Sequence, residues 1–289
     1  MEQLKEITGK AVVVPTGNEM INKFFGNEGV VQGALYFIYG PAGSSKSTFL
    51  QWLMKLVSTN PNNVPAFFSN EQNAIAIKEN CARIKMEGDF AIESEKKDLN
   101  DIMQACLELK AANPGKQLWI VVDALQGVTD AKNHPRKHGI EAHVINTLRE
   151  FAAKNQIIAF LIGHVNKKGQ YAGPTTINHN IDVELTITND SKFVRSVYVK
   201  KNRWGASGNS IRLNLANNSF EIMPEKSIME LDFSSKEDQA LMPKMMRLMK
   251  ENSIAGKIAQ ETMNQGKNVI RKAIVDGIKH AFRKATKRK

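Results

Sequence analysis

The residues between positions 40 and 48 have the types and the spacing of a phosphate-binding loop. They read Gly40, Pro41, Ala42, Gly43, Ser44, Ser45, Lys46, Ser47 and Thr48. In a tight loop that leads into a helix, backbone N–H groups surround a phosphate and the helix dipole favours its negative charge. Lys46 would neutralise the β- and γ-phosphates of a nucleotide such as ATP, and the Ser47 hydroxyl would hold Mg²⁺. The sequence therefore predicts a binding site for ATP and Mg²⁺.

One position in this loop departs from the usual pattern. The residue before the lysine is Ser45, where phosphate-binding loops have glycine. If the loop needs a positive φ there, a side chain is strained in a way that glycine is not. The serine therefore predicts local strain, and with it weaker nucleotide binding or slower hydrolysis.

Two acids follow apolar runs in the order that such a site requires. Asp123 ends the run 118–122, where a carboxylate can orient Mg²⁺ and its bound water. Glu71 follows the run 67–69 and is placed to polarise an attacking water as a general base. Either acid alone is more typical of a solvated strand end. The joint order of loop, Glu71 and Asp123 favours a catalytic role for both.

Short apolar runs alternate with helical patterns up to His164, which predicts an α/β fold with a mostly parallel sheet and crossover helices. The expected strands are 35–39, 66–69, 118–122 and 157–162, and the expected helices are 49–57, 74–85, 98–112 and 142–154. Beyond His164, polar and apolar residues alternate as in hairpin strands, in the segments 183–188, 193–200, 211–215 and 219–222. We expect an N-terminal segment (1–14), an ATPase domain (15–223) and a basic helical extension (224–289) with helices at 241–250 and 254–282.

Composition limits the protein's class and partners. The 289 residues contain two cysteines, too few for a disulfide scaffold or a four-cysteine zinc site, and no apolar run long enough to span a membrane. The charged N-terminus lacks a secretory signal, so we expect a cytoplasmic protein. Of the net charge of +11, +8 lies in residues 266–289. Such a tail is typical of nucleic-acid binding, with a solvated helix end as the alternative.

From about Pro15 to Leu215 the sequence resembles the ATPase core of the RadA (Sms) family, branch-migration proteins of the RecA superfamily. The matching stretches are Pro15-Thr16-Gly17, the phosphate loop, Phe68-Ser69-Asn70-Glu71-Gln72, Val121 to Gln126, the block from Gly163 to Asp182, and Lys200-Lys201-Asn202-Arg203-Trp204-Gly205. The resemblance implies a RecA-like P-loop ATPase core with Glu71 as the catalytic glutamate. The family's second acid is Gln72 here. Its zinc finger and its domain similar to Lon protease have no counterpart, as we expect of a phage-encoded form acting in the host cytoplasm.

The resemblance also implies that Lys201 and Arg203 act on the nucleotide of a neighbouring subunit. In RadA-like and DnaB-like rings, a basic pair at this place reaches across the subunit interface. We therefore expect a homo-oligomer, a hexameric ring, with a filament as the alternative. Without the resemblance, the motif would be an exposed basic hairpin that binds phosphate groups.

Two basic loops are expected to contact DNA, since in RecA-type assemblies the DNA-facing loops follow the strand of the second acid and the next strand. The first, 127–139, carries Lys132, Arg136 and Lys137, and the second, 166–176, carries Lys167, Lys168 and Tyr171. Tyr171 could stack on a base, while phosphate contacts would make binding salt-sensitive and not sequence-specific. His164 either senses the γ-phosphate and relays it to the second loop or is a structural histidine.

These features predict a Mg²⁺- and ATP-dependent motor on single-stranded or branched DNA, in recombination or repair, by branch migration or as a translocase or helicase. Two alternatives remain open. One is a strand-exchange recombinase filament of the RecA type. The other, suggested by Ser45 and Gln72, is a nucleotide-gated DNA-binding protein that does not hydrolyse ATP.

Overall fold

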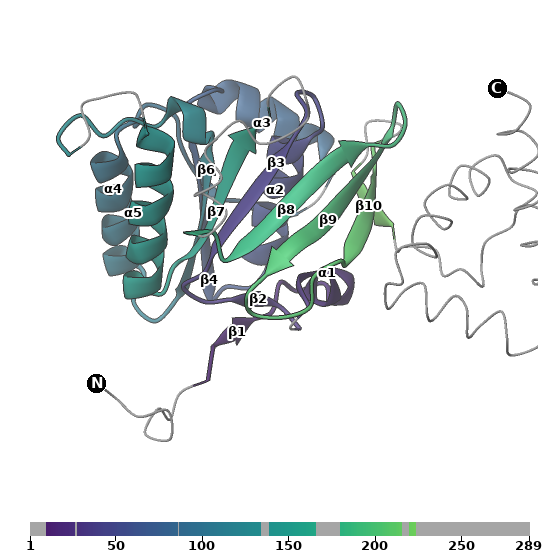
Figure 1. The fold of residues 1–289 in the computed structure, drawn as a ribbon, viewed down its shortest axis with the longest axis horizontal. Coiled ribbons are helices and arrows are strands. Elements are labelled where there is room, and N and C mark those ends of the chain that lie inside the picture. The colour runs from purple at the N-terminus through teal and green to yellow at the C-terminus, as the bar shows by residue number, and fades with distance from the viewer. Residues whose placement is uncertain are drawn as a thin grey trace, which may run out of the picture. The chain divides into compact units, whose positions relative to one another are not determined.

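The computed structural model of the chain describes residues 10–26, 28–85, 87–133, 139–165, 180–215 and 220–223 (Figure 1). It confirms the expected α/β fold with a large, mostly parallel sheet. The expected extension 224–289 lies outside the described residues, and so do five of the expected DNA contacts, Arg136, Lys137, Lys167, Lys168 and Tyr171.

Apolar runs form the centre of the main sheet. Among the described residues this sheet has nine strands in the order β11-β10-β9-β8-β3-β7-β6-β4-β5. The parallel part contains β3 (Leu35–Gly40), β4 (Asn63–Ser69), β5 (Ala91–Glu93), β6 (Gln117–Asp123), β7 (Ile158–His164) and β8 (Val183–Asn189). The antiparallel part continues from β8 through β9 (Val194–Asn202), β10 (Ser210–Asn214) and β11 (Glu221–Met223). The expected hairpin strands therefore extend the main sheet.

Helices cover both faces of this sheet. Side chains alternate along each buried strand, so both faces are apolar and both pack against helices. Tyr36 and Ile38 of β3 pack with α2 (Lys46–Ser58), whereas Leu35 and Phe37 pack on the other face with α4 (Leu99–Ala112) and α5 (Ile140–Asn155). α3 (Ala74–Arg83) contributes Ile77 to the α2 side. Figure 1 shows α4 and α5 together on one side of the sheet.

Local sequence explains where several helices begin. The side chains of Asn73 and Asp98 accept hydrogen bonds from backbone N–H groups in the first turns of α3 and α4, those of Ala76 and Asn100, as N-cap residues do. α4 stops at Asn113, directly before Pro114 and Gly115.

Within the described residues, none of the helices combines the length and the apolar character that crossing a bilayer requires.

The sequence did not predict five short elements. These are α1 (Glu19–Phe25), the 3₁₀ helix η2 (Leu125–Gly127), the edge strand β5, and the two-stranded pair of β1 (Val13–Val14) with β2 (Val30–Val31). Segments this short show little periodicity, which made these five hard to distinguish from loops. The buried side chains of α1, including Phe25, nevertheless belong to the core on the α2 side.

Candidate nucleotide site

The C-terminal ends of four neighbouring parallel strands bring the expected nucleotide-binding residues together. β3 ends at Gly40, which pairs with His164 at the end of β7, and Ser69 at the end of β4 pairs with Asp123 at the end of β6. In open α/β sheets this edge is where ligands bind. The phosphate loop, Glu71, Asp123 and His164 therefore lie at one edge of the sheet.

The loop backbone has the strained conformation that the sequence suggested. Ser45 has a φ of 70° and a ψ of 29°, in the left-handed region, and α2 begins at the next residue. For a residue with a side chain, this conformation costs on the order of 1 kcal/mol. Gly40 is needed because of close packing: a Cβ there would lie 2.3 Å from the backbone oxygen of Ile187 on β8. Glycine at position 40 thus lets the loop leave the sheet beside β8.

Lys46 is buried inside the loop with its amino group turned back to the backbone. Its Nζ donates hydrogen bonds to the carbonyl oxygens of Gly40 at 2.9 Å and Pro41 at 3.1 Å. Burial lowers the pKa of Lys46, and the nearby carboxylates of Asp123 and Glu71 offset part of that effect. An anionic phosphate in the loop would compensate the buried positive charge further.

Asp123 is a buried acid with unused hydrogen-bonding capacity. Its side-chain oxygens are inaccessible and have no partner at hydrogen-bonding geometry in the part of the chain that the structure describes. Burial raises its pKa to about 6; the nearby Ser47 hydroxyl lowers it, Glu71 raises it, and His164 and Lys46 lower it. Mg²⁺ takes one or two protein oxygens and keeps several waters, so Ser47 and Asp123 fit this ion.

Glu71 contacts the histidine that ends β7. The Nε2 atom of His164 lies 2.6 Å from Oε1 of Glu71, and the His164 N–H donates to the Gln126 side-chain oxygen at 3.3 Å. Gln126 in turn donates to Glu141 at 3.3 Å, so it joins the two ends of the 127–139 loop. Gln72, where the RadA pattern has a second acid, accepts a hydrogen bond from Asn80 on α3.

Sequence reasoning missed Asn70, which links the two segments that carry Glu71 and Asp123. Its amide group donates to the Ala124 carbonyl at 2.8 Å and accepts from the Ala124 N–H at 3.1 Å. Its own N–H donates to the Asp123 carbonyl at 2.8 Å. These three bonds fix Glu71, the residue after Asn70, relative to Asp123, the residue before Ala124. The position of Asn70 directly before Glu71 was the available signal.

Lys201 and Arg203 lie far from the phosphate loop of their own chain. The side chain of Asp182, which contacts Arg203, accepts a hydrogen bond from the N–H of Leu35, at the start of β3. The phosphate loop leaves β3 at its other end, Gly40, about 16 Å away for an extended strand. The structure therefore does not bring this basic pair into its own nucleotide site.

The first residues of the first expected DNA loop, 127–139, form a cluster of polar contacts. Asp130 is buried and contacts His143 Nε2 at 2.8 Å and the Asn133 N–H at 3.0 Å. Although burial raises the pKa of Asp130, hydrogen bonds from His143, Asn133 and Asn100 lower it to about 2. Lys132 is exposed beside this cluster. The cluster holds the base of the loop against α4 and α5.

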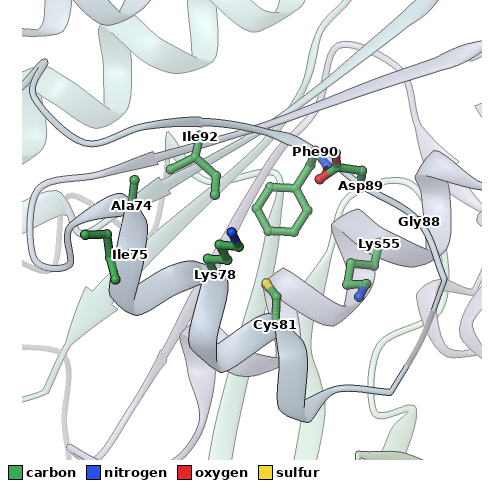
Figure 2. A pocket seen from close by; sticks show the side chains of 9 residues that line it. All are labelled: Lys55, Ala74, Ile75, Lys78, Cys81, Gly88, Asp89, Phe90 and Ile92. Carbon is green, nitrogen blue, oxygen red and sulfur yellow. Dashed lines mark hydrogen bonds between the residues drawn. The ribbon is translucent and has the colours of Figure 1, made fainter.

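A separate cavity of about 420 Å³ lies between α2, α3 and the segment 88–92. Figure 2 shows the side chains of Phe90, Ile92 and Cys81 around it. None of its lining residues belongs to the phosphate loop or to the acids described above.

The chain has a RecA-like α/β fold, and the residues expected to bind a nucleotide lie together at one edge of its sheet. A DnaB-like replicative helicase, solved with its interactions with primase, has a TM-score of 0.60 at 17% identity, over 75% of this chain and 63% of that one. A KaiC-like protein from Pyrococcus horikoshii OT3 has a TM-score of 0.59 at 14% identity, over 74% of this chain and all of that one. These likenesses establish the fold.

In sequence, the chain is similar to the bacterial DNA repair protein RadA, which confirms the resemblance inferred from the motifs. It is 25% identical to RadA of Aquifex aeolicus over 73% of this chain and 46% of that protein. It is 28% identical to RadA of Streptococcus pneumoniae over 66% of this chain and 44% of that protein. The chain thus spans less than half the length of these relatives. No family model matches it.

Proposed function

We propose that the chain is a DNA-dependent ATP hydrolase that acts in recombination or repair. The observation that carries this proposal is the convergence of Lys46, Ser47, Asp123 and Glu71 at one edge of a RecA-like sheet. The similarity to RadA supports DNA as the partner and DNA repair as the setting. The finer proposal is a motor on single-stranded or branched DNA, by branch migration or translocation.

Each residue of the site has a distinct task in ATP hydrolysis. Lys46 leaves its carbonyl partners and neutralises the β- and γ-phosphate oxygens. Ser47 and Asp123 would hold Mg²⁺, which would supply neutralisation of charge on the transferred phosphoryl group. Glu71 orients the attacking water and accepts its proton, for which its carboxylate must turn from His164 toward the water. His164 thereby joins the base to the start of the second DNA loop.

Lys201 and Arg203 act in trans, on ATP bound by the adjacent subunit. Their position at the opposite end of β3 from their own phosphate loop supports this assignment. An arginine supplied across an interface stabilises transition-state charge and accelerates hydrolysis on the order of 10³-fold or more. Trans action requires a homo-oligomer, for which we propose a hexameric ring.

A mixing experiment tests hydrolysis and trans action together. Arg203→Ala and Lys46→Ala should each lose ATPase activity. The first lacks the trans-acting arginine, called the finger below, and the second lacks the loop lysine. Mixed oligomers place the intact finger of Lys46→Ala against the intact loop of Arg203→Ala, so activity should partly return. Mixed oligomers that form but stay inactive would contradict trans action.

DNA is proposed to bind at the edge of the sheet that also holds the nucleotide. The contacts come from the loops that follow β6 and β7, through Lys132, Arg136, Lys137, Lys167, Lys168 and Tyr171. Because phosphate contacts dominate, the logarithm of affinity should fall linearly with the logarithm of salt concentration. Electron micrographs with ATP and DNA distinguish a ring from the filament expected of a strand-exchange recombinase.

The left-handed conformation of Ser45 favours one second candidate, a DNA-binding protein gated by nucleotide but without hydrolysis. In that case the Ser45→Gly variant, which removes the strain, should bind ATP more tightly and still release no phosphate. Phosphate release by the unmodified chain would exclude this candidate.

A further inference from the structure

The corner before β8 is built around one buried carboxylate, that of Asp182. Its Oδ1 accepts from Nε of Arg149 at 3.0 Å and lies 3.4 Å from Nη1 of Arg203. Its Oδ2 accepts the Leu35 N–H at 3.1 Å, and its backbone carbonyl accepts the Arg203 N–H at 3.0 Å. The side chain of Asp182 is only 4% exposed. Both the backbone and the side chain of Arg203 are thus held by this one residue.

The partner of Arg203 in the basic pair is attached to the same corner. Nζ of Lys201 donates to the carbonyl oxygen of Ile181 at 2.7 Å, one residue before Asp182. Three positive charges, on Lys201, Arg203 and Arg149, therefore gather here, and the carboxylates of Asp182 and Glu184 oppose them. Without the charge of Asp182, the two arginines would repel each other and the Arg203 side chain would lose its fixed direction.

The two arginines on Asp182 differ in what they connect. Arg149 comes from α5, so its contact ties the carboxylate to the body of the domain. Arg203 follows β9 at the surface, and 38% of its side chain is exposed. A guanidinium has five donors, so it can contact Asp182 and still donate to a phosphate of another chain. Asp182 thus has the geometry of a support for an outward-facing arginine.

We propose that Asp182 is the positioning residue for the trans-acting basic pair, holding Arg203 in the direction in which it meets the nucleotide of the neighbouring subunit. This inference rests on the proposed trans action of Arg203. It gives Asp182 a role in the neighbour's site, although Asp182 also bonds to β3 of its own chain.

The test uses the Asp182→Asn variant, which keeps the shape and one acceptor oxygen but removes the charge. We expect unchanged ATP affinity, measured with a fluorescent ATP analogue, and a fall in turnover on the order of 10²-fold from misdirection of Arg203. Mixing with Lys46→Ala should restore activity, because that chain supplies a correctly held finger to the intact loop of Asp182→Asn.

A structural role for Asp182 gives a different outcome in the same mixture. If its bond to Leu35 mainly supports β3 and the phosphate loop, the defect lies in the variant's own site, and Lys46→Ala cannot restore activity. No recovery here, beside recovery in the Arg203→Ala mixture, would overturn the inference and leave trans action intact. Failure of both mixtures would overturn trans action itself, and the inference with it. Normal turnover of Asp182→Asn alone would also overturn it.

A double variant keeps the test valid if an unpaired arginine disturbs folding. Asp182→Asn combined with Arg149→Gln replaces the charged pair with a neutral one, and far-UV circular dichroism checks the fold. The double variant should show the same loss of turnover and the same recovery on mixing. Arg149→Gln alone is the matched control, because it leaves Asp182 with Arg203 and should retain most of the turnover. Equal losses in Arg149→Gln and Asp182→Asn would contradict a specific role in holding Arg203.

Discussion

Burial makes Asp123 an acid whose charge the fold disfavours. Within the described part of the chain its oxygens make no hydrogen bond of good geometry, and burial raises its pKa to about 6 even though the Ser47 hydroxyl lies close enough to lower it. A bound Mg²⁺ with its waters would satisfy these oxygens and favour the ionised form. The residue is therefore well suited to a metal-bound state and poorly suited to a state without metal.

The raised pKa of Asp123 predicts a pH-dependent stability in the absence of Mg²⁺ and nucleotide. In the unfolded chain this carboxyl ionises near pH 4, and in the fold near pH 6, so its ionisation destabilises the fold as the pH rises through this window. From pH 4 to pH 7, Asp123→Asn should gain about 2 kcal/mol in free energy of unfolding relative to the unmodified chain. Urea unfolding at several pH values measures this difference, and a difference that does not change with pH would contradict the prediction.

Glu71 is predicted to act in hydrolysis and not in binding. Glu71→Gln keeps the size of the side chain and its contact with His164 but cannot accept a proton from water. We expect normal ATP affinity and a fall in turnover on the order of 10²- to 10⁴-fold. Equilibrium binding of a fluorescent ATP analogue and phosphate release measure the two properties separately. A variant that still turns over ATP at near-normal rate would remove Glu71 from the role of general base.

At the scale of elements, the alignment of β4 with β6 controls the distance between the two acids. Asn70 continues this alignment just beyond the ends of both strands through its paired bonds to Ala124. Asn70→Ala leaves two backbone groups of Ala124 without these partners, which costs about 1–3 kcal/mol for groups kept from water. We expect lower stability and a larger fall in turnover than in ATP affinity.

Asn155→Ala is the matched control for Asn70→Ala. Asn155 also bonds to a backbone carbonyl, that of Phe151, but at the end of α5 and far in the sequence from both acids. Melting temperature and turnover of the two variants are compared directly. If Asn155→Ala lowers turnover as much as Asn70→Ala does, the effect reflects general stability and not the alignment of β4 with β6.

The sequence was sufficient to predict the elements whose own residue pattern is distinctive. β3, β6 and β7 are apolar runs buried on both faces, and the glycine-rich loop between β3 and α2 identifies the first crossover. β5 has three residues and is partly exposed, so no pattern distinguished it from a loop. Contacts between distant residues were equally hidden. Asn70 meets Ala124 across 54 positions, and Asp182 meets Leu35 across 147.

At the scale of the whole molecule, the phosphate loop and the basic pair belong to opposite ends of β3. In the sequence, both belong to the motifs shared with RadA. Their separation becomes visible only in the pairing of β3 with β7 and β8. Under the proposed trans action, a chain with this arrangement completes a nucleotide site only together with a second copy. Assembly and hydrolysis are therefore coupled in the proposed function.

The rate of ATP hydrolysis by the full chain, measured with and without single-stranded DNA beside the Lys46→Ala variant, tests the central claim most directly. The unmodified chain should release phosphate in the presence of Mg²⁺, and single-stranded DNA should raise that rate. Lys46→Ala should lose both activities while its far-UV circular dichroism stays the same, because the fold does not depend on the loop's charge. Phosphate release by the unmodified chain no faster than by Lys46→Ala, with or without DNA, would contradict the account.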